Sequence, residues 1–259
     1  MGKYTILIGY ASDTGNVRTQ NQDSLLIKRG SIENDDFLLV AVADGMGGMQ
    51  SGEVASQMIM AELNDWWQTV LSELVTPSLD MEKVSSSLSA VIATANEKIY
   101  ETGQESGARM GTTLSLLFGF QKDYLFKHIG DSRIYHYRNR KLSQITKDHT
   151  WVQQEIDRGV LSFQDSQNHR MKHVLTKALG VEPSVQIDEG WGQMTNNSQF
   201  LLCSDGFYQY IQKDELGQFL ERKLDVQEKI NCMMEQIKSS TADDNATGAL
   251  IHVKKSWFG

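Results

Sequence analysis

The chain of 259 residues carries 33 acidic and 25 basic side chains, for a formal net charge of −8, and 40% of its residues are apolar. Such a composition is typical of a globular protein with a sizeable core. The acidic balance argues against general binding to nucleic acid or to an anionic membrane surface, because both require clustered positive charge. The two cysteines, Cys203 and Cys232, form no CxxC pair, which excludes a disulfide scaffold and a cysteine-rich zinc site.

No segment of the sequence predicts a membrane anchor or a secretory signal. The longest apolar run, at 37–43, is far shorter than a membrane-spanning helix. The N-terminal stretch MGKYTILIGYASD lacks a small-residue cleavage site and is better interpreted as a first strand. We therefore expect a soluble, cytoplasmic protein.

The hydrophobic pattern predicts one domain over 1–259, of the α+β class. Only two prolines occur, and no linker, repeat or run of like charge divides the chain. Strands are predicted at 4–10, 23–28 and 37–43, and the continuous apolar run at 37–43 is typical of a strand that is buried on both faces. Two long amphipathic helices follow, at 52–74 and 82–101.

The second half combines runs of strands with shorter helices. Strands are predicted at 112–120, 124–129, 133–138 and 142–146, followed by a short helix at 149–158 and a polar, mobile surface segment at 161–173. Further strands at 185–191, 200–203 and 249–253 flank two helices at 213–222 and 226–237. Because the strands come in runs rather than in strict alternation with helices, mainly antiparallel sheets are expected.

Aspartates recur where the apolar strands end. Asp44, Asp131 and Asp205 follow such strands, and Asp244 precedes the last one. A single aspartate in such a place is usually a turn residue or a helix cap. Four of them predict that the strands converge and gather carboxylates whose repulsion must be neutralised. Hard divalent cations do this, and oxygen-only ligation selects Mg²⁺ or Mn²⁺ over zinc.

Arg18 and the glycine-rich turn after Asp44 add to this interpretation. An arginine in a polar loop is usually just solvated, but beside a metal-bound carboxylate cluster its planar fork can hold a phosphate by two charge-assisted hydrogen bonds. The glycine-rich turn fits neither nucleotide-binding motif, and its backbone, including the Gly45 carbonyl, can approach a ligand closely. Metals together with an arginine are the combination expected for phosphoryl chemistry.

Seven ordered motifs extend the interpretation over almost the whole chain. They are RTQNQDS, VADGMGGMQSGEVAS, GTTLSLL, HIGDSRIYHYRNRKLSQITKDHT, LTKALG, LLCSDGFY and DDNAT. In this order they resemble the bacterial branch of the metal-dependent protein phosphatase family (PPM, the type 2C Ser/Thr phosphatases). The resemblance implies a four-layer fold, in which a central antiparallel β-sandwich is flanked by pairs of helices. It also implies a flap at about 150–175 beside the active site.

The resemblance gives each candidate residue a role. It implies two core Mn²⁺ or Mg²⁺ ions and a weaker third ion. Asp44 would bridge the core ions, and the Gly45 carbonyl would complete the shell of one of them. Asp205 and Asp244 would bind the second core ion, and Asp131 with Asp205 would hold the third ion. Asp23 would support the water shell of the second ion, and Arg18 would bind the substrate phosphate. The implied reaction is direct attack on phosphoserine or phosphothreonine by a water or hydroxide between the core ions.

Met46 and Met49 stand where relatives carry histidines, so no protein general acid is assigned. Two other functions stay open at this level. One is a catalytically silent regulatory module that binds phosphoproteins, and the other is a metal-dependent hydrolase of small phosphoesters. The expected partners are phosphorylated proteins, including Ser/Thr kinases and their substrates, and the chain is expected to be a monomer. The pair at 66–67 and Trp151 are interpreted as packing residues.

Overall fold

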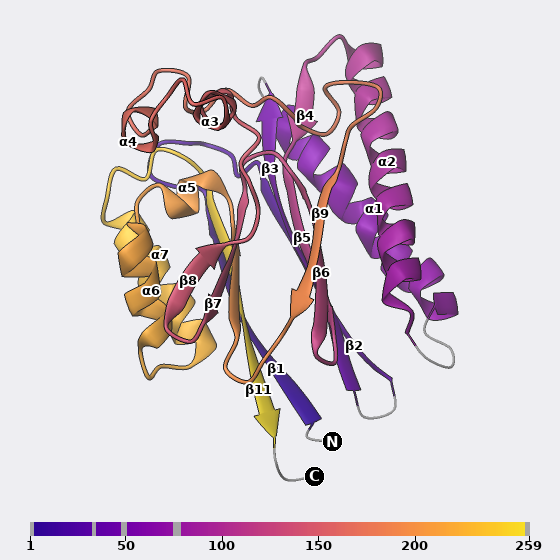
Figure 1. Cartoon of the computed structure of the whole chain (residues 1–259). Helices are drawn as coiled ribbons and strands as arrows, with labels where there is room; N and C mark the ends of the chain where they lie inside the picture. Colours follow the sequence, from indigo (N-terminus) through magenta and orange to yellow (C-terminus); the bar gives the residue numbers. More distant parts are fainter. Residues whose placement is uncertain (1–2, 33–34, 48–50, 75–78, 257–259) are drawn as a thin grey trace.

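Two antiparallel sheets pack face to face between pairs of helices (Figure 1). The structure is a computed structural model that describes residues 3–32, 35–47, 51–74 and 79–256. The four-layer arrangement implied by the sequence motifs is confirmed. None of the helices in these described ranges has the length and apolar character needed to cross a membrane.

Sheet A brings the two ends of the chain together. Its strands, in spatial order, are β1 (Lys3–Asp13), β11 (Ala246–Ser256), β10 (Gln199–Cys203), β7 (Arg133–Arg138) and β8 (Lys141–Gln144). β1 and β11 pair along their full length of 11 residues, from Lys3 opposite Ser256 to Asp13 opposite Ala246. The first and last strands therefore lie side by side.

Sheet B is built from the middle of the chain. Its strands, in spatial order, are β2 (Asp23–Ile32), β3 (Asp35–Gly47), β5 (Leu114–Phe120), β6 (Asp123–Ile129) and β9 (Asp188–Gln193), and the short β4 (Met110–Thr112) pairs with the end of β3. Sheet B is covered by α1 (Ser51–Leu74) and α2 (Met81–Ser106), and sheet A by α6 (Lys213–Glu221) and α7 (Val226–Lys238).

The alternation along Phe37–Ala43 shows why this run is continuously apolar. Its odd-numbered side chains pack in the core beneath α1 and α2. Its even-numbered side chains lie in the core between the two sheets. A strand in the second of four layers has no face left for water, so the prediction of burial on both faces is confirmed. A third core lies beneath α6 and α7.

The tryptophans interpreted as packing residues do pack. Trp66 is 3% exposed, its ring meets Phe118 edge to face, and its indole N–H donates a 2.7 Å hydrogen bond to Ser87 Oγ. Trp67 packs against Phe37, and Trp151 stacks on His169 with ring centroids 5.0 Å apart.

Several predicted boundaries were wrong for identifiable reasons. The strand expected at 112–120 is divided into β4 and β5, because Thr113 uses its amide and its hydroxyl to hold Asp44. β11 begins earlier than expected, since its first residues, Ala-Thr-Gly, give no apolar signal. The strand expected at 185–191 lies at 188–193, and the strand expected at 142–146 lies at 141–144.

Three short helices lie at the end of the sandwich where β3 finishes. They are α3 (Trp151–Asp157), α4 (Phe163–Ser166) and α5 (Asp205–Tyr208). The helix expected at 149–158 is confirmed as α3. The segment at 161–173, expected to be a polar, mobile surface segment, contains α4. The helix α5 was not predicted, because a helix of four residues is too short to show periodicity.

Candidate metal centre

Five aspartates from both sheets lie at this same end of the sandwich. Asp23 is the first residue of β2 and lies directly opposite Asp44 of β3. Asp131 occupies the turn between β6 and β7. Asp205 follows β10 as the first residue of α5, and Asp244 lies just before β11. We call these five residues the carboxylate cluster. The convergence inferred from the strand ends is thus present in the fold.

The backbone of Asp44 is fixed by two threonines of the GTT motif. Its amide donates a 2.9 Å hydrogen bond to Thr113 Oγ1, and its carbonyl accepts one from the Thr113 amide at 2.9 Å and one from Thr112 Oγ1 at 2.9 Å. Thr113 Oγ1 also lies 2.7 Å from Ser132 Oγ, beside Asp131. The motif therefore ties the end of β3 to the turn that carries Asp131.

Asp23 is held by the opposite sheet. Its Oδ2 accepts a 2.7 Å hydrogen bond from Ser204 Oγ, which in turn accepts a 3.0 Å hydrogen bond from the amide of Thr247. Asp23 and Ser204 are both buried. The carboxylate cluster is therefore joined across the two sheets by a hydrogen bond rather than by packing alone.

Gly45 has no room for a side chain. Its amide donates a 3.1 Å hydrogen bond to the carbonyl of Gln22, and a Cβ at this position would clash with the carbonyl of Gly52 in α1. The close approach seen here is to the backbone of α1, whereas the approach of the Gly45 carbonyl to a ligand stays a prediction. Met46 is 37% exposed next to it, whereas Met49 lies outside the described residues.

Burial and mutual repulsion make these carboxylates costly to ionise together. Burial raises the pKa of Asp23 to about 7, against the hydrogen bond from Ser204. Burial also raises the pKa of Asp44 well above its usual range, and the charges of Asp23, Asp205, Asp131 and Asp244 raise it further. These four therefore lie within electrostatic reach of Asp44.

Asp131 and Asp244 show the same effect. Burial raises the pKa of Asp131 well above its usual range, the charge of Asp205 adds to this, and Arg133 opposes it. Burial, followed by the charge of Asp205, raises the pKa of Asp244, and Arg18 opposes it.

Two oxygens of the carboxylate cluster have their bonding capacity unused. Among the described residues, Asp23 and Asp205 each have a buried Oδ1 atom that accepts no hydrogen bond. Buried oxygens without partners, in a cluster where burial and neighbouring charges raise the pKa of Asp23, Asp44, Asp131 and Asp244, are the donor set that a hard divalent cation neutralises. In the part of the chain that the structure describes, no three His, Cys, Asp or Glu side chains are already arranged around one metal position. The aspartates are therefore near one another, but they do not form a preformed coordination shell.

Arg18 reaches the carboxylate cluster through Asp244. Its Nη2 lies 3.0 Å from Asp244 Oδ2, and its side chain is 49% exposed. Its loop is held by Asn245, whose side-chain amide donates to the carbonyls of Thr14 and Gln20 at 2.8 and 2.9 Å. The arginine predicted to bind phosphate therefore stands at the edge of the cluster with half of its surface in solvent.

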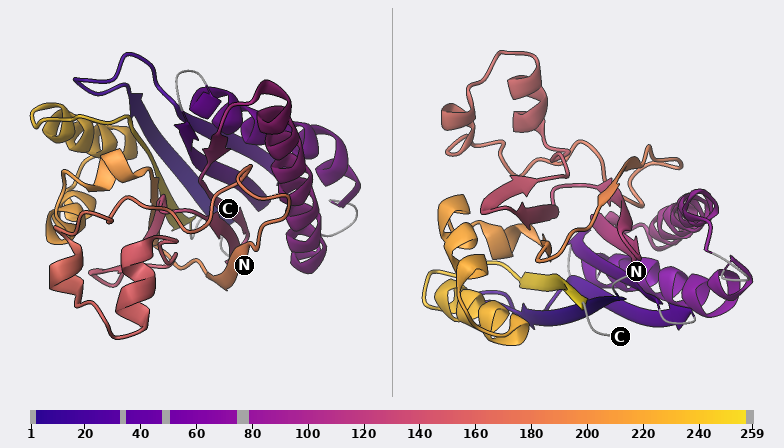
Figure 2. Two further views of the ribbon diagram at one scale, coloured as in Figure 1. Left: turned by 90° about the horizontal axis from the view of Figure 1, so that it is seen from above. Right: turned by 60° about the horizontal axis from the view of Figure 1, so that its bottom comes forward.

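The segment expected to form a flap is closed at its base. Trp151 donates its amide to the carbonyl of Val174 at 2.8 Å, and Thr176 donates to that of His149 at 2.8 Å. Figure 2 shows the segment carrying α3 and α4 projecting beyond the sheets. Next to this base, His173 Nδ1 lies 3.6 Å from Asp205 Oδ2.

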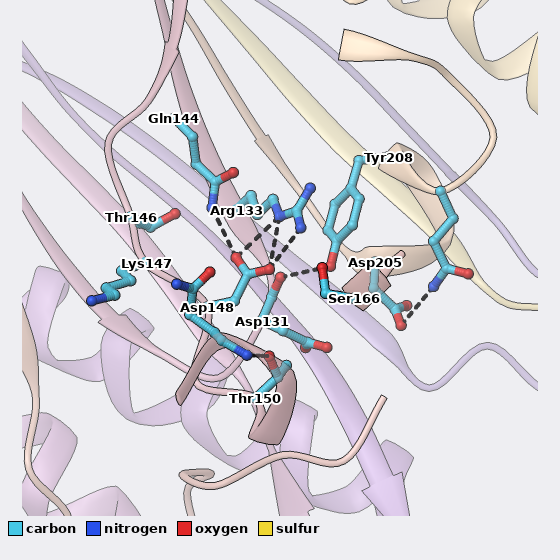
Figure 3. Close-up of polar contacts among 12 residues, drawn as sticks. Asp131, Arg133, Gln144, Thr146, Lys147, Asp148, Thr150, Ser166, Asp205 and Tyr208 are labelled. Atoms are coloured by element: carbon cyan, nitrogen blue, oxygen red, sulfur yellow. Dashed lines mark hydrogen bonds and ion pairs between the residues drawn. The ribbon is translucent and has the colours of Figure 1, made fainter. Parts of the chain in front are cut away.

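Sequence reasoning did not single out several residues that organise this end. Asn245, Ser204, Thr113 and Asp148 all lie within or beside the quoted motifs, yet only the structure gives them partners. Asp148 binds Arg133 of the GDSR motif through both of its oxygens (Figure 3). Their signal in the sequence was their place within motifs that also carry a predicted ligand.

Comparisons with known proteins agree with the motifs. The family model "Protein phosphatase 2C" matches residues 16–241. The serine/threonine phosphatase stp of Listeria monocytogenes serotype 4b is 33% identical over 245 residues, which cover 93% of this chain and 94% of that protein.

Solved structures share the fold. The serine/threonine phosphatase of S. agalactiae superimposes with a TM-score of 0.86 at 26% identity, covering 95% of this chain and 99% of that chain. The catalytic domain of the serine/threonine protein phosphatase PstP, solved in complex with two manganese ions, superimposes with a TM-score of 0.82 at 28% identity, covering 97% of this chain and 100% of that chain. The resemblance inferred from the motifs is confirmed, and the chain belongs to the protein phosphatase 2C family.

Proposed function

We propose that the chain hydrolyses phosphoserine and phosphothreonine in proteins, with divalent cations bound at the carboxylate cluster. The observation that carries this proposal is the convergence of five mutually repelling aspartates from both sheets, two of them with an unpartnered buried oxygen. Family membership and the names of the bacterial relatives support the substrate class. Phosphorylated proteins, including Ser/Thr kinases and their targets, are the proposed partners.

The proposed metal ligands are the residues assigned from the motifs. They are Asp44, the Gly45 carbonyl, Asp205 and Asp244 for two core Mn²⁺ or Mg²⁺ ions, Asp131 with Asp205 for a weaker third ion, and Asp23 for the surrounding water. The chemistry that such ions supply when bound is a water of lowered pKa and positive charge near the phosphate.

The remaining steps depend on side chains of this chain. Arg18 binds the substrate phosphate, since its guanidinium is half-exposed and its planar fork matches two phosphate oxygens. Asp244 orients that guanidinium in the structure. Met46 has no proton to give, so the departing serine or threonine oxygen takes its proton from water. A cysteine nucleophile is not proposed, because Cys203 is fully buried within β10 and neither Cys203 nor Cys232 begins a CxxxxxR signature.

The full set of acidic residues favours an enzyme over a silent phosphoprotein-binding module. A module needs no cluster of buried carboxylates, and each of these costs free energy in the absence of a cation. The two are separated by the release of inorganic phosphate from a phosphopeptide. A nucleotide monophosphate assayed in parallel distinguishes a protein phosphatase from a hydrolase of small phosphoesters.

The first test is the substitution Asp44→Asn, with Asp36→Asn as a matched control at the other end of β3. With Mn²⁺ present, Asp44→Asn should lower kcat for a phosphothreonine peptide by about a hundredfold or more, because catalytic charge stabilisation is lost. Asp36→Asn should retain activity, and a chelator should abolish it in the unmodified chain. Full activity of Asp44→Asn would disprove the proposal.

The second test concerns Arg18. Arg18→Ala should raise KM about tenfold with a smaller change in kcat, as expected for the loss of a charge-assisted phosphate contact. Arg29→Ala is a close control. The Arg29 side chain is also 49% exposed, and it also pairs with an aspartate, Asp36, which lies far from the carboxylate cluster. Equal KM values for the two variants would remove Arg18 from the site.

A further inference from the structure

Arg133 is the centre of a polar network beside the carboxylate cluster (Figure 3). Its Nε and Nη2 donate to both oxygens of Asp148 at 2.6 to 3.1 Å, and its Nη1 donates to the hydroxyl of Tyr135 at 3.0 Å. The guanidinium also lies over the ring of Tyr208, 3.7 Å from the ring centroid. A planar cation held on its edge and on its face in this way has little freedom to move.

Tyr208 connects this network to two of the five aspartates. Its hydroxyl donates a 3.1 Å hydrogen bond to the backbone carbonyl of Asp131. Tyr208 is also the last residue of α5, the four-residue helix that begins at Asp205. The ring stacked on Arg133 therefore joins the turn that carries one carboxylate to the helix that carries the other.

The segment that follows Asp148 holds the same turn from its other side. His149 accepts a 3.0 Å hydrogen bond from the amide of Gly130 at Nδ1, and its own amide donates to the carbonyl of Gly130 at 2.7 Å. Asp148 is itself oriented by Gln144, which donates to Oδ1 at 2.8 Å. The turn at Asp131 is thus fixed by Tyr208 on one side and by His149 on the other.

We infer that Arg133, Asp148 and Tyr208 are positioning residues, which hold Asp131 and Asp205 together so that a divalent cation binds between them. This inference rests on the proposed function, which assigns those two aspartates to the weaker ion. None of the three positioning residues is a proposed ligand. Their effect is exerted through the turn at Asp131 and through α5.

The most selective variant is Tyr208→Phe. It keeps the ring over Arg133, and it removes only the hydroxyl that bonds the Asp131 carbonyl. Tyr137→Phe is the matched control, since the hydroxyl of Tyr137 in β7 donates a 2.7 Å hydrogen bond to Glu221 of α6, away from the carboxylate cluster. Arg133→Lys is a second variant, which keeps the positive charge but not the two-pronged contact with Asp148.

The measurement is a Mn²⁺ titration followed by the EPR signal of free Mn²⁺, which needs no turnover. Tyr208→Phe should weaken the lowest-affinity class of sites about three- to tenfold, the range expected from one hydrogen bond, with the tighter classes unchanged. Arg133→Lys should weaken the same class, and Tyr137→Phe should match the unmodified chain. A thermal melt of each variant verifies that it is folded.

Asp131→Asn separates this inference from the proposed function. If Asp131→Asn loses the weakest class while Tyr208→Phe and Arg133→Lys bind like the unmodified chain, the positioning role is wrong and the metal assignment stands. If Asp131→Asn loses no Mn²⁺ binding, the assignment of Asp131 is wrong and the positioning role falls with it. The loss of hydrolysis in Asp44→Asn would still support the phosphatase in that case.

Discussion

Ser204, which directly follows β10, donates a 2.7 Å hydrogen bond to Asp23 of β2, and this contact joins the two sheets at the end that carries the carboxylate cluster. Because the Ser204 hydroxyl also accepts the amide of Thr247, both of its bonding roles are used. The contact therefore fixes the separation of the sheets at the place where the proposed ligands from both must meet.

Ser204→Ala should destabilise the protein by about 1–3 kcal/mol, since a buried carboxylate oxygen and a buried amide both lose their partner. The free energy of unfolding is measured by urea titration in the presence of a chelator. Ser239→Ala is the control, because the exposed Ser239 hydroxyl only donates to the carbonyl of Gln236. Equal losses of unfolding free energy in the two variants would show that the inter-sheet contact stabilises the protein no more than the exposed contact of Ser239 does.

Divalent cations should stabilise the folded chain. Buried carboxylates that repel one another lose that cost when a cation neutralises them, and a ligand at about a hundredfold excess over its Kd contributes about 2.7 kcal/mol. For a chain of this size the melting temperature should rise by roughly 5–10 °C with Mn²⁺. Sodium chloride of equal ionic strength is the control. An identical rise in Asp44→Asn would place the stabilising ion elsewhere.

His136 should make the protein less stable in mild acid. Burial lowers its pKa to about 4 from 6.5, so the folded state keeps the neutral ring while the unfolded chain binds a proton below about pH 6.5. Stability from this group is complete above pH 6.5 and is lost as the pH falls towards 4. His136→Phe keeps the stack on Phe200, whose ring centroid lies 4.2 Å away, but removes the titration.

The difference in unfolding free energy between pH 7.5 and pH 5 should therefore be smaller in His136→Phe, by an amount on the order of 1 kcal/mol. Comparing each protein with itself at the two pH values cancels the loss of the Ser198 contact. His128 and His252, whose pKa values are also lowered to about 4, remain in the variant, so part of the pH dependence should persist. An unchanged difference would contradict the prediction.

Gly180 of the LTKALG motif should not tolerate a side chain. Its φ is +79°, its amide donates a 2.9 Å hydrogen bond to Asn96, and a Cβ there would collide with Ile99 of α2. Gly180→Ala should cost about 2 kcal/mol or more. Gly217→Ala, in α6 with open space around it, should instead stabilise the protein by about 0.5–1 kcal/mol. Urea unfolding should show that Gly180→Ala lowers the free energy of unfolding and that Gly217→Ala raises it.

The sequence predicted the strands, the helices and their buried faces because those signals are local, whereas the four-layer arrangement was implied by the family resemblance. An apolar run such as 37–43 has to be covered on both sides, and the stripe along α2 has to face a sheet. The positions of Asp44, Asp131 and Asp205 were predicted for the same reason, since a charged residue after an apolar strand marks the place where that strand leaves the core.

The rest depends on which strands become neighbours. That Asp23 lies opposite Asp44 is a matter of register, and that Ser204 reaches Asp23 is a matter of how two sheets pack. Neither relationship produces a periodic pattern of residues that could be recognised in the sequence. The bond from Tyr208 to Asp131 joins residues far apart in the chain through a helix of only four residues, which leaves no pattern either.

The pairing of β1 with β11 has a consequence for biosynthesis. As the polypeptide leaves the ribosome, β1 emerges long before β11, the neighbour with which it pairs along all 11 residues. The strands of sheet B, together with α1 and α2, are all synthesised before Asp244 and β11. The acids of the proposed site can therefore be gathered only after the chain has been synthesised as far as Asp244.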